Sequence, residues 1–70
     1  MAETYIVHVN VEQLRARCSQ CEQRVLTDAE ARERLIGYGF YPRIDGLFVA
    51  EEAVLRQLDP SEIISVSPVC

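Results

Sequence analysis

Two cysteines, Cys18 and Cys21, lie three residues apart in the segment Cys-Ser-Gln-Cys. Thiols at this spacing can ligate zinc or form a redox couple. A structural zinc site needs four ligands, however, and the other soft ligands in the chain are His8 and Cys70. A redox pair is expected at a helix N-terminus, whereas Cys18 falls about two turns inside a predicted helix. We expect both cysteines to pack as small apolar side chains, with a zinc site completed by His8 or Cys70 as the alternative.

The single histidine, His8, could serve as a metal ligand or a general base. No Ser, Asp or Glu can be placed beside it from spacing alone. A nucleophilic pair with Cys18 or Cys21 would also need a substrate pocket, for which 70 residues leave little room. We therefore expect His8 to be a strand residue in contact with solvent, and the protein not to be an enzyme.

Acidic residues outnumber basic ones by eleven to seven, which gives a net charge of −4, and every basic residue is an arginine. Such a chain repels phosphate backbones and favours basic partners. The five acids of residues 41–70 could form one negative face that docks on a basic protein, with a tyrosine as the aromatic anchor. A solvated surface of mixed charge is the alternative. The predicted partner-binding residues are Asp45, Glu51, Glu52, Asp59, Glu62 and Tyr41.

A DNA-binding protein is a third possibility, because a strand, two helices and a hairpin follow one another as in a winged helix without its first helix. Residues 28–36 would then be the recognition helix and Asp45-Gly46 the wing tip. The arginines available for phosphates would be Arg32, Arg34 and Arg43. Acids on the same helix argue against this function, and an ion pair of Glu30 with Arg34 explains the pattern without a ligand.

The elements that position these residues begin with a strand at residues 4–9, where apolar side chains alternate. Asn10 is a predicted N-cap for a helix that starts at Val11 and runs to Leu26. The core stripe of this helix is predicted to be Val11, Leu14, Cys18, Cys21 and Val25.

A capping box of Thr27 and Glu30 predicts a second helix over residues 28–36, which Gly37 and Gly39 end.

Asp45-Gly46 lies between two apolar runs and predicts a hairpin with a two-residue turn. Its first strand contains Pro42, which cannot donate to a ladder, so this strand should be a sheet edge. A short helix is expected at residues 51–58 and a last strand at residues 62–67, followed by a loose tail at residues 68–70.

The sequence thus predicts a single α+β domain over residues 1–70 with the order β-α-α-β-β-α-β. We expect a mostly antiparallel sheet of three or four strands with helices packed on one face. No apolar run is long enough to span a bilayer and no signal peptide is evident, so a cytoplasmic location is expected.

The leading functional hypothesis is a non-enzymatic protein-binding module that acts stoichiometrically. Inhibitors of nucleic-acid-handling defence complexes, carried by phages or mobile elements, fit that class. A homodimer is a further hypothesis, because sheet edges must be paired or protected.

Overall fold

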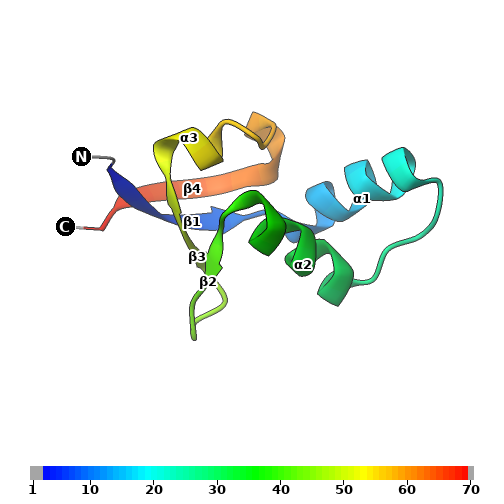
Figure 1. Ribbon diagram of the computed structural model, residues 1–70, viewed down its shortest axis with the longest axis horizontal. Helices are drawn as coiled ribbons and strands as arrows, with labels where there is room; N and C mark the ends of the chain where they lie inside the picture. The colour runs from blue at the N-terminus through cyan, green and yellow to red at the C-terminus, as the bar shows by residue number, and fades with distance from the viewer. Residues whose placement is uncertain (1–2, 70) are drawn as a thin grey trace.

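The first strand of the chain lies inside a sheet of four antiparallel strands (Figure 1). The computed structural model describes residues 3–69. The elements are β1 (Thr4–Val9), α1 (Val11–Glu22), α2 (Asp28–Tyr38), β2 (Tyr41–Pro42), β3 (Phe48–Glu51), α3 (Glu52–Leu55), the 3₁₀ turn η1 (Pro60–Glu62) and β4 (Ile63–Pro68). The strands are arranged in the order β2-β3-β1-β4. The predicted α+β class and element order are confirmed, and the strand with the proline is an edge, as expected.

The core occupies one face of this sheet. Val7 and Phe48 lie opposite each other in β1 and β3, and each is at most 1% exposed. Leu14 of α1 and Leu35 of α2 are fully buried in the same cluster. Phe40, which follows α2, packs edge-to-face on Phe48 with ring centroids 6.3 Å apart. The helices therefore cover one face of the sheet, and within residues 3–69 none has the length and apolar character of a membrane span.

Both predicted caps begin the long helices. The Asn10 side chain accepts a hydrogen bond from the Gln13 N–H at 3.3 Å, which starts α1. The Thr27 hydroxyl accepts from the Glu30 N–H, and the Glu30 carboxylate accepts from the Thr27 N–H, so the capping box is complete. Each bond satisfies an N–H that the first helical turn leaves without a partner.

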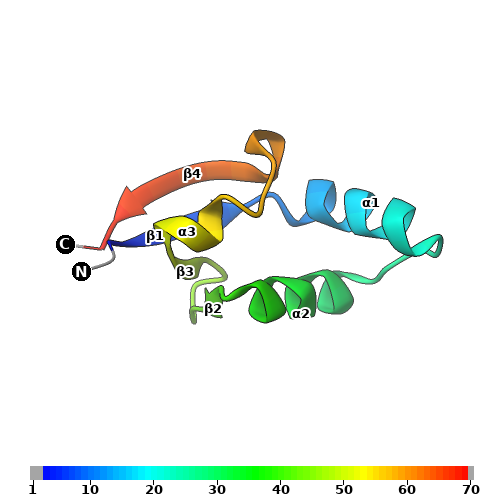
Figure 2. The ribbon, with the colours of Figure 1, turned by 45° about the horizontal axis from the view of Figure 1, so that its top comes forward.

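The prediction that the C-terminal part of the α1 stripe lies in the core is wrong. The helix ends at Glu22, because Gln23 turns the chain with a left-handed φ of 55°. Cys21 is therefore exposed and Val25 is 87% exposed, whereas Leu26 is buried in their place. Figures 1 and 2 show the reason: α1 and α2 extend together beyond one end of the sheet, so the last turn of α1 has no sheet to cover.

The hairpin between β2 and β3 closes with three loop residues instead of two. The Arg43 N–H donates to the Leu47 carbonyl at 2.8 Å, and the loop between them is Ile44, Asp45 and Gly46. Only Gly46 takes a positive φ, 87°, so Asp45 does not adopt the left-handed conformation that a two-residue turn would require. A β-turn followed by one left-handed glycine is the next most common hairpin connection.

The helix predicted at residues 51–58 is shorter in the structure. Regular α3 ends at Leu55, and the chain reaches β4 through the short turn η1. Pro68 is the final residue of β4, and the Val69 N–H donates to the Thr4 carbonyl at 3.2 Å. Residues 68 and 69 therefore continue the ladder with β1, while Cys70 lies outside the described residues.

Candidate partner-binding face

The sheet has a second face, which we call the open face. Ile6 and His8 of β1 alternate with the buried Val7 and Val9, so their side chains project on the side opposite the core. The strand registers extend this face across all four strands. The open face consists of Thr4, Ile6, His8, Tyr41, Val49, Glu51, Ser65 and Ser67.

An apolar row crosses the open face from β2 to β1. Tyr41 is paired with Val49, and Val49 with Ile6. The Tyr41 side chain is 70% exposed, while Ile6 and Val49 are half-buried. Glu51 lies on the same face two residues from Val49, so the structure brings together Tyr41 and Glu51 of the predicted binding residues. The alternation in residues 4–9 separates Ile6 from Val7 and Val9, but only the register identifies Val49 as the neighbour of Ile6.

The hairpin loop that follows β2 carries another exposed apolar side chain. Ile44 at the tip is 108% exposed, which means that nothing packs on it. Its neighbours Arg43 and Asp45 form an ion pair with Nη2 and Oδ2 3.2 Å apart. The Leu47 N–H donates to the Asp45 carboxylate, and this bond, aided by Arg43, lowers the pKa of Asp45. The tip is therefore apolar and locally charge-balanced, and the exposure of Ile44 was not among the predictions from residue type and spacing.

The remaining predicted acids are distributed over separate elements. Glu52 starts α3 and pairs with Arg56 one turn later at 3.5 Å. Asp59 lines a surface depression beside α1 together with Arg17. Neither Glu51 nor Asp59 has an arginine within ion-pairing distance in the described part of the chain. These two carboxylates therefore leave unbalanced negative charge on the surface.

Glu62 does not contribute to an exposed acidic face. Its side chain is 2% exposed and accepts hydrogen bonds from Nε and Nη2 of Arg17, the latter at 3.0 Å. It also accepts from the Asp59 N–H at 2.9 Å, and its own carbonyl accepts from the Asn10 N–H at 2.7 Å. These contacts join the β1–α1 junction to the start of β4, which gives Glu62 a structural role.

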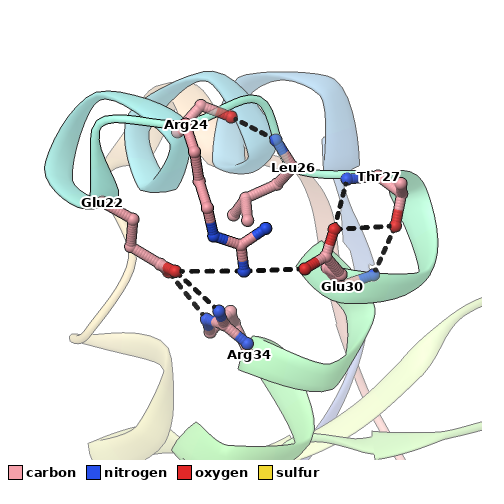
Figure 3. A network of polar contacts seen from close by, with 7 residues as sticks. Glu22, Arg24, Leu26, Thr27, Glu30 and Arg34 are labelled. Atoms are coloured by element: carbon pink, nitrogen blue, oxygen red, sulfur yellow. Dashed lines mark hydrogen bonds and ion pairs between the residues drawn. The ribbon is translucent and has the colours of Figure 1, made fainter.

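The arginines of the winged-helix alternative are each in contact with another part of the protein. Arg34 makes a two-point ion pair with Glu22 of α1, at 2.7 and 2.8 Å, and not the expected pair with Glu30 (Figure 3). Glu30 pairs instead with Arg24 at 2.7 Å, which holds the pKa of Glu30 down to about 2. Arg32 lies over the ring of Phe48, 5.9 Å from its centroid. Arg43, as described above, pairs within the hairpin loop.

The cysteines and His8 lie on different surfaces. Cys18 is 5% exposed within the core, whereas His8 is on the open face, so the sheet separates the two side chains. Cys21 is exposed on the last turn of α1. Residues 3–69 contain no group of three or more His, Cys, Asp or Glu side chains with metal-binding geometry. The predicted core position holds for Cys18 and is wrong for Cys21; Cys70, the other predicted zinc ligand, lies outside the described residues.

Comparisons with models of protein families, with curated proteins and with solved structures found no match for this chain.

Proposed function

We propose that this protein is a non-enzymatic binding module that attaches stoichiometrically to a basic surface of another protein. The observation that carries the proposal is the apolar row Tyr41–Val49–Ile6 on the open face beside Glu51, whose carboxylate has no ion-pair partner among residues 3–69. The exposed faces of antiparallel sheets normally carry polar side chains, because they face water. An apolar row at this position is better explained by a partner that removes it from water.

The side-chain types on this surface are those that contribute most to binding. Tyrosine is enriched among the residues that dominate interface energies, because it buries a large area with few rotatable bonds. Tyr41 lies next to the β2–β3 loop, where Ile44 provides a second exposed apolar contact. Glu51 at the rim favours arginine or lysine on the partner and steers the encounter.

The class of target follows from charge. A chain with a net charge of −4 is attracted to surfaces rich in arginine and lysine, and such surfaces often hold nucleic acid. We therefore propose a target that handles nucleic acid in the cytoplasm, and an inhibitory outcome because the bound module would occupy the nucleic-acid site. Inhibitors that phages or mobile elements carry against nucleic-acid-handling defence complexes fit this class.

Site-specific photo-crosslinking in extract of the source cells tests the proposal. A benzophenone amino acid at position 41 should capture one partner protein at a one-to-one ratio. The same probe at position 25 should capture none, because Val25 lies in the α1–α2 connection and not on the open face. Val25 is 87% exposed and Tyr41 70%, so poor accessibility would not explain a lack of capture at position 25. Equal capture from both positions would refute the assignment of the open face.

Binding constants of variants for the captured partner then test the chemistry. Tyr41→Ala should weaken binding by about 2 kcal/mol, or about 30-fold in Kd, because it removes a central anchor. Glu51→Arg should also weaken binding, with a loss that shrinks at high salt. Glu33→Arg is the matched control, since Glu33 is exposed on α2 and the charge change is the same. If Glu33→Arg weakens binding as much as Glu51→Arg, net charge and not the open face determines binding.

A further inference from the structure

The outer strand β4 leaves one of its two backbone edges without a partner strand in the described residues. It pairs with β1 on one side and is the last strand in the sheet order. Its sequence, Ile-Ile-Ser-Val-Ser-Pro, contains no charged side chain. Ile64 and Val66 are 56% and 40% exposed. A strand of this length and composition is the type of edge that adds another strand.

The opposite edge of the sheet is protected against such addition. Strand β2 has only two residues, and one of them is Pro42, which has no N–H to donate. Short edges and prolines are the usual devices that prevent edge pairing. The two edges therefore differ, and β4 is the one that is available for pairing.

The ladder shows which backbone groups of β4 are free. The Val69 N–H donates to the Thr4 carbonyl, which makes this pair one of the hydrogen-bonded pairs of the ladder. Bonded pairs alternate along antiparallel strands, so Ser67 and Ser65 also direct their N–H and C=O groups toward β1. Val66 and Pro68 direct theirs away from β1. Val66 thus offers both a donor and an acceptor at the open edge, whereas Pro68 offers only an acceptor.

We propose that β4 pairs with β4 of a second copy, antiparallel and centred on Val66. In this register each Val66 N–H donates to the Val66 carbonyl of the other copy. Ser65 then lies opposite Ser67 of the second copy, and Ile64 lies opposite Pro68. The two sheets would form one continuous sheet of eight strands, because each contributes four.

The chemistry of the strand favours a second copy over an unrelated strand. A two-fold register centred on Val66 places valine opposite valine and serine opposite serine, and its outer pairs of Ile64 with Pro68 are apolar. Like charges directly opposite each other are destabilising in antiparallel pairs, and an uncharged strand avoids this although the whole chain carries a net charge of −4. The contact involves one strand per copy, so we expect weak and reversible association.

Sedimentation equilibrium from about 1 µM to about 1 mM tests the proposal directly. The wild-type protein should show a concentration-dependent rise toward twice the 8.0 kDa mass of one chain. Val66→Lys and Val66→Glu should each remain monomeric, because two side chains of like charge would lie directly opposite each other in the β4–β4 pair. Their Cβ atoms would be about 5 Å apart. Val66→Thr keeps the branched shape without charge and should still dimerise. Circular dichroism of every variant checks that the strand is still folded.

Mixing the two charged variants gives the decisive result. If Val66 faces Val66, the Lys and Glu variants should form a heterodimer that native mass spectrometry resolves by mass, although neither dimerises alone. This recovery also excludes misfolding as the cause of the monomers. A wild-type chain that stays monomeric throughout the concentration range overturns the proposal, as does a dimer that persists in both charged variants. Neither result bears on partner binding by the open face, which the crosslinking at position 41 tests separately.

Discussion

Replacing Arg17 should destabilise the protein more than replacing its ion-pair partner Glu62. The two side chains share the same hydrogen bonds, but they are buried to different extents: the Arg17 side chain is 36% exposed and that of Glu62 is 2% exposed. When Glu62 is replaced, water can still reach the guanidinium. When Arg17 is replaced, a buried carboxylate loses the only cation that pairs with it in the described chain.

The expected magnitudes follow from this asymmetry. Removing one member of a buried ion pair costs about 3–5 kcal/mol, because the other charge is left uncompensated. We expect Arg17→Met to lie near the lower end, about 3 kcal/mol, since the depression beside α1 gives Glu62 a short path to water. Glu62→Gln keeps an acceptor for the Asp59 N–H, which it bonds at 2.9 Å, and should cost about 1–2 kcal/mol. A domain of this size has a total stability of about 4–10 kcal/mol, so both effects are measurable.

Urea unfolding at pH 7, followed by far-UV circular dichroism, measures these differences. The double variant Arg17→Met/Glu62→Gln is the critical sample, because it removes both charges. Its loss of stability should be smaller than the sum of the single losses, since the orphaned carboxylate is gone. If Glu62→Gln costs as much as Arg17→Met, or if the two losses add, then the Glu62 carboxylate without Arg17 does not carry the penalty of an uncompensated buried charge. Either result would refute the predicted asymmetry.

Three further predictions test other parts of the structure. Cys18→Ala should cost about 1–2 kcal/mol in urea unfolding through lost core packing, whereas Cys21→Ala should change stability by less than about 0.5 kcal/mol. Gly37→Ala should stabilise α2 by about 0.5–1 kcal/mol because its φ is not positive and an added methyl group meets nothing within 4 Å; Gly39→Ala, with φ +114°, should destabilise it, and thermal melts distinguish the two. The pKa of Glu30 is lowered to about 2 from its ordinary 4.5 by Arg24 first, so its contribution to stability is present above pH 4.5 and is lost as the pH falls toward 2. As the pH falls from 4.5 toward 2, the melting temperature of Glu30→Gln should therefore fall less steeply than that of the wild-type protein. Equal slopes for the two proteins would count against the ion pair.

The predictions from sequence that succeeded rest on local chemistry. Asn10 and the pair Thr27 and Glu30 cap helices within a single turn, so the two residues that make each bond are only three positions apart in the sequence. The alternation in residues 4–9 predicted β1 as a strand, and Pro42 predicted an edge. These signals sufficed for the element order and the fold class.

The predictions that failed depend on contacts between distant segments. Helical spacing placed Cys21 and Val25 in the core, but the sheet ends before the last turn of α1 does. Glu62 looked like one more surface acid, because its partner Arg17 is 45 residues earlier in the chain. The apolar row of the open face likewise arises from the strand register, which residue types alone do not determine.

The central position of β1 sets the order in which the protein can acquire its structure during synthesis. Both neighbours of β1 come later in the chain, β3 at residues 48–51 and β4 at residues 63–68. Strand β1 therefore leaves the ribosome about forty residues before any strand can pair with it. In the meantime β1 can pack only on α1 and α2, which contribute Leu14 and Leu35 to the same core and are joined by the ion pairs of Figure 3. A nascent chain that stalls before residue 48 would expose an unpaired apolar strand, which makes this stage of synthesis the one most exposed to aggregation and to capture by chaperones.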